Sequence, residues 1–204
     1  MEKIDQVLSH YKIADRVMSG VMGQLNFRRV LKPKKTDQYF QTLVSAIIGQ
    51  QLSGKAADTI EARVLELMKE KNFSPRKVLE ADEQQLRQAG MSWAKITYVK
   101  NIASAFKSGK IEAEELTQLE DEAVIQTLTQ IKGVGRWTAE MFLIFTLGRE
   151  DVYSSGDLGL NKALRKIYQL ESPTLKEIDG IIEPWSPYKS YGSLALWESL
   201  DNRP

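Results

Sequence analysis

Residues 128–142, LTQIKGVGRWTAEMF, constrain the fold of this 204-residue chain more than any other stretch. Apolar residues recur at helical spacing before and after a short centre, which predicts two helices joined by a tight turn. The turn contains Gly133 and Gly135, and glycine allows a positive φ and a close approach of another backbone. We expect the second helix to begin at or near Gly135. The apolar residues are Val124, Ile125, Leu128 and Ile131 before the turn, and Ala139, Met141, Phe142 and Phe145 after it.

The turn is a predicted anion site. The first N–H groups of the second helix have no partners within the helix, and they point out of the turn with the positive end of the helix dipole. We therefore predict a phosphate contact made by five consecutive residues, Lys132, Gly133, Val134, Gly135 and Arg136. The residues alone leave one alternative open, which is a plain helical hairpin with a glycine turn.

Helical periodicity continues along most of the chain and predicts an all-α fold of about nine to eleven helices. Longer helices are predicted over residues 2–22, 38–48, about 54–71, 93–107 and 158–169, and shorter ones after Ser74, Asp82, Pro173 and Pro187. Ser53, Asp82 and Ser92 are predicted N-caps. The acidic residues 112–122 are predicted to be solvated surface. No alternating β-branched run is long enough to predict a strand.

Composition excludes several kinds of site and partner. The chain has no cysteine, which excludes disulfides, thiolate zinc sites and an iron–sulfur cluster. It has one histidine, His10, so we expect neither a histidine-based metal site nor a Ser–His triad. No apolar run reaches about 18 residues and the start lacks the apolar segment of a signal peptide, so no membrane association is expected. A net charge of +1 implies that any nucleic-acid affinity comes from local patches and backbone amides.

Residues 131–139, IKGVGRWTA, resemble the helix-hairpin-helix of the HhH-GPD DNA glycosylase superfamily. In that family a Gly/Pro-rich loop with an essential aspartate follows the hairpin. Residues 152–160, VYSSGDLGL, resemble this loop, with Asp157 as the aspartate. The subfamily that the chain resembles most is that of the alkylpurine, or 3-methyladenine, DNA glycosylases (type II). Their loop often carries Pro before the Gly or Asp, and Ser155-Gly156 departs from that pattern.

The resemblance implies a helix-hairpin-helix glycosylase fold with two helical lobes that flank an active-site cleft. It implies a single unit over residues 1–204, with subdomains of roughly residues 30–135 and residues 1–29 plus 136–204. Larger relatives carry an extra N-terminal α/β domain, which we do not expect in this chain.

Asp157 is the expected catalytic residue. It directly precedes a predicted helix, where an Asp is ordinarily an N-cap, and the two roles are compatible because a helix N-terminus favours negative charge. Cleavage of an N-glycosidic bond places positive charge on the sugar at C1′. A carboxylate can stabilise that charge and orient or deprotonate water. Bifunctional relatives have a nucleophilic lysine at the position of Trp137, so the resemblance implies hydrolysis by water.

Recognition of an alkylated purine requires aromatic walls, because the base is cationic and aromatic faces attract cations. By the resemblance, Trp137 and Tyr188 line the base site, and Met141 lies one helical turn after Trp137. Packing in the core is the alternative for all three. Gln51 falls where relatives insert a wedge into the gap left by a flipped base. The residues themselves do not decide between Gln50 and Gln51.

The sequence thus predicts a monofunctional DNA glycosylase that excises alkylated purines, of the 3-methyladenine and 7-methylguanine type, in base excision repair. The expected partner is double-stranded DNA containing alkylated bases, bound by a monomer. No cofactor is required for the chemistry, and a structural monovalent cation at the hairpin is an option. The expected compartment is the cytoplasm, with the nucleoid, in a bacterium and the nucleus in a eukaryote. The alternatives are a non-catalytic helix-hairpin-helix DNA-binding module and a structural hairpin in an unrelated helical protein.

Overall fold

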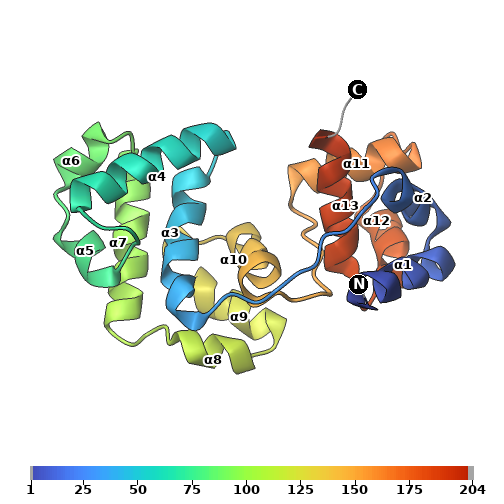
Figure 1. Cartoon of the computed structure of the whole chain (residues 1–204), viewed down its shortest axis with the longest axis horizontal. Coiled ribbons are helices and arrows are strands. Elements are labelled where there is room, and N and C mark those ends of the chain that lie inside the picture. The colour runs from blue at the N-terminus through green and yellow to red at the C-terminus, as the bar shows by residue number, and fades with distance from the viewer. Residues whose placement is uncertain (1, 202–204) are drawn as a thin grey trace. The chain divides into compact units, whose positions relative to one another are not determined.

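The computed structural model describes residues 2–201. These residues form thirteen α-helices, two short 3-10 segments and one π-helical turn, and they contain no strand (Figure 1). The all-α fold class is confirmed. The number of α-helices exceeds the expected nine to eleven because one predicted helix is broken and a predicted surface stretch is helical.

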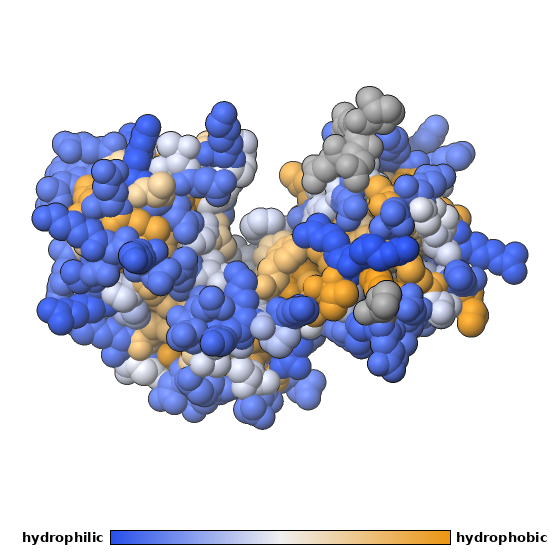
Figure 2. Space-filling model, in the orientation of Figure 1, coloured by the Kyte–Doolittle hydropathy of each residue, from blue (hydrophilic) through white to orange (hydrophobic). Residues whose placement is uncertain are grey.

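The helices group into two compact units. We call Lys34–Leu147 the central unit, and Met1–Pro33 with Gly148–Pro204 the terminal unit. The chain therefore passes between units after Pro33 and after Leu147, whereas the sequence-based division placed these boundaries near residues 30 and 135. Hydrophilic side chains cover most of the drawn face of the central unit, while the drawn face of the terminal unit shows hydrophobic side chains as well (Figure 2).

The central unit is built around α3, which packs against α4, α7 and α10. Its helices are α3 (Tyr39–Gly49), α4 (Gly54–Met68), α5 (Pro75–Glu80), α6 (Glu83–Gln88), α7 (Trp93–Lys107), α8 (Ala113–Gln118), α9 (Asp121–Thr129) and α10 (Arg136–Phe142), with η1 (Thr36–Gln38) and η2 (Leu143–Leu147). The predicted caps Ser53, Asp82 and Ser92 are confirmed. Each side chain accepts a hydrogen bond from the backbone N–H three residues later.

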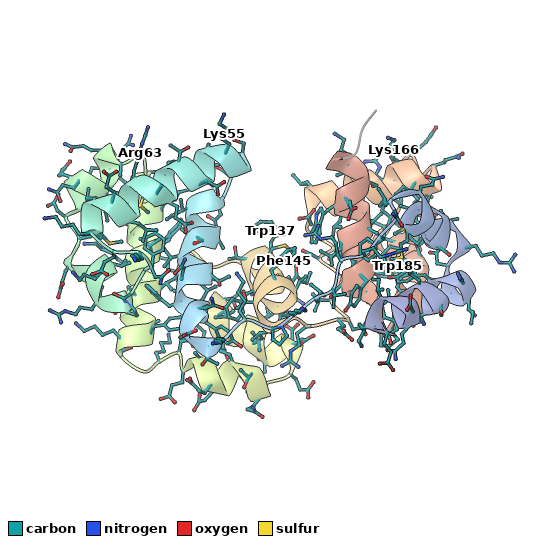
Figure 3. The ribbon with its side chains drawn as sticks, in the orientation of Figure 1. Lys55, Arg63, Trp137, Phe145, Lys166 and Trp185 are labelled. Atoms are coloured by element: carbon teal, nitrogen blue, oxygen red, sulfur yellow. The ribbon has the colours of Figure 1, made fainter. Side chains whose placement is uncertain are left out.

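The terminal unit buries Trp185 completely, together with aromatic side chains of α1 and α13 (Figure 3). Its helices are α1 (Glu2–Ala14), α2 (Arg16–Gln24), α11 (Leu158–Tyr168), α12 (Leu175–Ile182) and α13 (Lys189–Asp201), with η3 (Glu183–Trp185). Gly192 is required for this packing. A Cβ there would lie 2.5 Å from atoms of both Trp185 and Tyr11.

The prediction of one helix over residues 2–22 is wrong, because the chain breaks at Asp15. Asp15 has an extended backbone, with φ of −155° and ψ of 100°, and its Oδ1 accepts from the Met18 N–H to cap α2. Its Oδ2 accepts from Trp185 Nε1 at 2.7 Å and from the Tyr168 hydroxyl. The break is therefore stabilised by residues far away in the sequence, which local periodicity does not report.

The acidic side chains of residues 112–122 are exposed or half-buried, as a solvated surface requires. The stretch is also helical, since it contains α8 and the start of α9, and Leu116 is buried. One apolar side chain per short helix is enough to attach it to the core, and the acidic neighbours mask that signal in the sequence.

Candidate functional site

The two glycines of the hairpin have different roles. Gly133 has φ of +109°, and a Cβ there would lie 2.2 Å from Cγ of Tyr98. Gly135 is the N-cap of α10, with an ordinary φ of −90° and ψ of 170°, and a Cβ there would meet no atom within 4 Å. Gly133 is thus required by the fold, while Gly135 leaves the surface in front of the α10 N-terminus open.

Backbone contacts hold the hairpin in shape. The Val134 N–H donates to the Ile131 carbonyl at 2.9 Å, and the Val134 side chain is buried. The Lys132 carbonyl accepts from Nδ2 of Asn101 on α7 at 3.0 Å, while the rest of Lys132 is exposed. The loop is therefore fixed before any ligand arrives, and Val134 can reach a phosphate only through its backbone.

Arg136 is engaged by two carboxylates. Its NH1 and NH2 donate to Glu122 at 3.0 and 2.8 Å, and its Nε donates to Glu140 at 3.0 Å. The hydrogen bond from Arg136 also lowers the pKa of Glu122. The hairpin thus carries less uncompensated positive charge than its sequence suggests, and a phosphate at Arg136 would have to compete with these carboxylates.

Trp137 and Met141 lie four residues apart on α10 and share one helix face. Trp137 is 41% exposed and Met141 is half-buried. Phe145 continues the helical spacing of the apolar residues after the turn, yet it is 38% exposed (Figure 3). The physical reason is η2, because a π-helix has more residues per turn than an α-helix and shifts the register after α10. Phe145 is therefore a further aromatic candidate on this segment.

The two adjacent glutamines in the turn after α3 have different environments. The Gln50 side chain donates from Nε2 to the Thr138 hydroxyl of α10 at 3.3 Å. Gln51 is exposed and has a left-handed φ of +58°. The Gln50 side chain is thus held by a hydrogen bond within the central unit, and Gln51 is the residue that the turn presents to solvent.

Asp157 is the N-cap of α11, as predicted, and is only 8% exposed. Its Oδ1 accepts from the Leu160 N–H at 2.7 Å and from Nε1 of Trp197 at 3.2 Å. A Cβ on Gly159 would lie 3.0 Å from this oxygen, so glycine leaves the space that the carboxylate needs. Sequence reasoning missed Trp197, because its helical spacing on α13 indicates core packing and nothing more.

Tyr153 lies four residues before Asp157 in the same loop. Its hydroxyl is buried and has no hydrogen-bond partner among the described residues. Burial raises the pKa of Tyr153, and the charge of Asp157 raises it further. Tyr153 therefore stays a neutral phenol at physiological pH and adds no negative charge beside Asp157.

Tyr188 is already packed by its own chain. Nζ of Lys3 lies 5.4 Å from the Tyr188 ring centroid, and the rings of His10 and Tyr191 contact it edge-on at centroid distances of 5.3 and 5.9 Å. This environment favours the packing alternative, and stacking of a base on Tyr188 stays a prediction.

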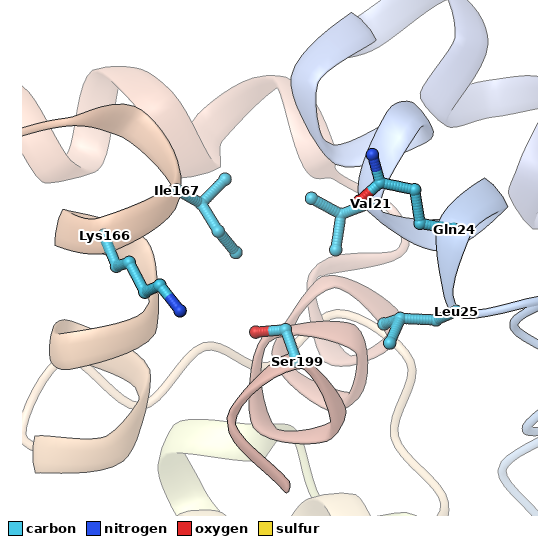
Figure 4. A pocket seen from close by; sticks show the side chains of 6 residues that line it. All are labelled: Val21, Gln24, Leu25, Lys166, Ile167 and Ser199. Atoms are coloured by element: carbon cyan, nitrogen blue, oxygen red, sulfur yellow. The ribbon is translucent and has the colours of Figure 1, made fainter. Parts of the chain in front are cut away.

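The terminal unit contains a pocket of about 450 Å³, and none of the residues that line it is a predicted site residue (Figure 4). It is lined by Val21, Gln24, Leu25, Lys166, Ile167 and Ser199. Lys166 and Ile167 belong to the end of α11 opposite Asp157. Within residues 2–201 no three His, Cys, Asp or Glu side chains are grouped so as to hold a metal ion. No helix in that range is long and apolar enough to cross a membrane.

Comparison with known proteins places this arrangement in a family. Residues 44–187 match the model of the HhH-GPD superfamily base excision DNA repair protein. The chain is 36% identical over 177 residues to DNA-3-methyladenine glycosylase 1 of Schizosaccharomyces pombe, covering 85% of this chain and 77% of that protein. It is 33% identical over 189 residues to the DNA-3-methyladenine glycosylase of Saccharomyces cerevisiae, covering 86% of this chain and 63% of that protein. The solved structure of the S. pombe 3-methyladenine DNA glycosylase with abasic DNA matches with a TM-score of 0.85 at 31% identity, covering 96% of this chain and 97% of that one.

Proposed function

Because this chain belongs to the HhH-GPD superfamily of base excision DNA repair proteins, we propose that it is a monofunctional DNA glycosylase for alkylated purines. It hydrolyses the N-glycosidic bond of bases of the 3-methyladenine and 7-methylguanine type in duplex DNA. The similarity to two yeast 3-methyladenine DNA glycosylases supports this substrate class. The alternative of a non-catalytic DNA-binding module accounts for the hairpin but gives no role to the Asp157 loop.

The observation that carries the proposal is the placement of Asp157. Two N–H donors, from Leu160 and Trp197, hold one carboxylate oxygen at the start of α11. Positive charge develops at C1′ as the bond breaks, and a fixed carboxylate stabilises it without having to reorganise. An alkylated purine leaves readily as a neutral base, so no strong general acid is required.

The proposal assigns separate roles to the predicted site residues. In the central unit, the hairpin N–H groups bind a DNA phosphate and Gln51 fills the gap left by the flipped base. Trp137 and Met141 contact that base, and we add Phe145 on account of its exposure. In the terminal unit, Asp157 acts on the sugar. The protein works as a monomer on genomic DNA and needs no cofactor for the chemistry.

Gly135→Ala is expected to weaken duplex binding about tenfold, equally for damaged and undamaged DNA, because it obstructs a phosphate contact that carries no sequence information. The backbone conformation of Gly135 suits alanine and the new Cβ has open space, so the fold is retained. A low-salt fluorescence anisotropy titration measures the affinity. Gly180→Ala, whose Cβ also meets no atom within 4 Å, is the matched control. Unchanged affinity in a folded Gly135→Ala protein would refute the phosphate site.

The proposed function also predicts the product. Incubation with methylated duplex DNA should release free base and leave an intact strand with an abasic site. Trp137 stands where a lysine nucleophile would, Lys132 lies on the other side of the glycines, and Lys162 is on the exposed side of α11. Borohydride added during turnover should therefore trap no protein–DNA adduct. Adduct yields comparable to turnover would contradict hydrolysis by water, and binding without base release would favour the non-catalytic module.

A further inference from the structure

We propose that Lys95 is a positioning residue that holds the Gln50–Gln51 turn in the conformation which presents Gln51 to the DNA. Lys95 lies in the first turn of α7, and α7 packs along α3, the helix that ends in this turn (Figure 1). The inference rests on the proposed function, because it assigns to Lys95 a role that matters only if Gln51 enters the duplex.

The contacts of Lys95 are unusual for a lysine. Its Nζ donates to the Ile48 carbonyl at 2.7 Å and to the Gln50 carbonyl at 2.8 Å. Within residues 2–201 no carboxylate forms an ion pair with it, and burial lowers the pKa of its ammonium group. A lysine that only solubilised the surface would not be drawn inward to backbone carbonyls.

These two carbonyls belong to the end of α3. The last carbonyls of a helix have no partners within the helix, and a cation near a helix C-terminus interacts favourably with the dipole. Lys95 therefore caps α3 from a neighbouring helix. Because its ammonium group donates to both the Ile48 and the Gln50 carbonyl, Lys95 also fixes the direction in which the chain leaves the helix.

The residue that follows is in a strained conformation. Gln51 has φ of +58°, a region that costs a non-glycine residue free energy and persists only when the surroundings enforce it. Lys95 holds the carbonyl of Gln50 on one side of the turn, and the hydrogen bond from Gln50 to Thr138 holds its side chain on the other. The turn is thus clamped between α7 and α10, and Gln51 projects from it.

A wedge works only if it is in place when the base leaves the stack. A loose turn would have to be ordered at that moment, and the ordering cost would reduce the rate of excision from a duplex. Excision from a single strand needs no wedge, because there is no stack to hold open. Loss of Lys95 is therefore expected to affect duplex substrates selectively.

The test compares single-turnover excision of 7-methylguanine from duplex and single-stranded oligonucleotides of the same sequence. Lys95→Met should lower the duplex rate roughly tenfold and the single-strand rate less than about twofold. Lys107→Met removes the same charge from the exposed other end of α7 and should change neither rate. Equal losses on the two substrates would overturn the proposal, because a general loss of stability gives that result.

A double-mutant cycle identifies the route of the effect. In a Gln51→Ala background, Lys95→Met should change the duplex rate less than about twofold, since the residue it positions is already absent. A full additional loss in that background would show that Lys95 does not act through Gln51. If Lys95→Met does not fold, Lys95→Gln provides the same comparison. If the wild-type protein released no base, the proposed function itself would be overturned. If the wild type were active but the rate losses of Lys95→Met and Gln51→Ala were additive, only the role of Lys95 would be overturned.

Discussion

Asp157→Asn is expected to lower base excision by about three orders of magnitude while leaving the fold intact. Asparagine has the shape of aspartate, and its carbonyl oxygen can still accept from the Leu160 N–H and from Nε1 of Trp197. The cap of α11 is therefore retained, while the negative charge is lost. That charge is what stabilises the developing cation at C1′ and activates water, so the loss should appear in the chemical step.

Single-turnover release of base from methylated duplex DNA measures this step, and a binding titration on the same duplex should give nearly the same affinity as the wild type. Asp82→Asn is the matched control, because Asp82 also caps a helix through its side chain but lies in the central unit and is not a predicted site residue. A folded Asp157→Asn protein with near-normal excision would reduce Asp157 to a structural cap and leave the catalytic residue to be found elsewhere.

Local features of the chain could be predicted from the sequence. The caps at Ser53, Asp82, Ser92 and Asp157 each depend on one side chain and on a backbone N–H three residues later. The hairpin is similar, because Gly133 lies between two strongly periodic segments and its positive φ is what a tight turn requires. Such signals are contained within a few residues and survive any tertiary arrangement.

Features that depend on long-range contacts could not be predicted. The hydrogen bond from Trp197 to Asp157 joins residues 40 positions apart, and the sequence shows Trp197 only as an apolar residue of a helix. The pairing of Arg136 with Glu122 spans 14 positions and changes a free cation of the hairpin into a compensated one. The exposure of Phe145 follows from a π-helical turn, which helical periodicity does not encode.

Asp15 takes part in both a local interaction and long-range contacts. Its cap of α2 is local, yet the sequence shows apolar spacing that runs straight through it, so one helix was predicted over residues 2–22. What decides the break is the pair of long-range hydrogen bonds from Trp185 and Tyr168. Tyr168 ends α11, whose other end carries Asp157. Asp15 therefore fixes the far end of the helix that presents the proposed catalytic carboxylate.

Asp15→Ala is accordingly expected to destabilise the terminal unit by roughly 3 kcal/mol. The substitution removes the cap of α2 and leaves the indole N–H of Trp185, a completely buried residue, without its acceptor. Orphaning a buried donor costs more than losing an exposed hydrogen bond, because the desolvation of the donor is no longer offset. In a chain of this size the melting temperature should fall by about 6–12 °C, and excision should be affected less than by Asp157→Asn.

The control for this prediction separates the cap from the buried network. Asp82→Ala removes an N-cap of the same kind, but Asp82 is exposed, and among the residues that the structure describes its side chain accepts only from the Gln85 N–H. In Asp15→Asn, the side-chain oxygen can still accept from the Met18 N–H. The amide nitrogen then stands in place of Oδ2, and it cannot accept the hydrogen bonds from Trp185 and Tyr168. Thermal unfolding followed by circular dichroism should give a small loss for Asp82→Ala and a large one for both Asp15 variants. If Asp15→Ala cost no more than Asp82→Ala, Asp15 would be only a helix cap, and the hydrogen bonds to α11 and η3 would not hold the terminal unit together.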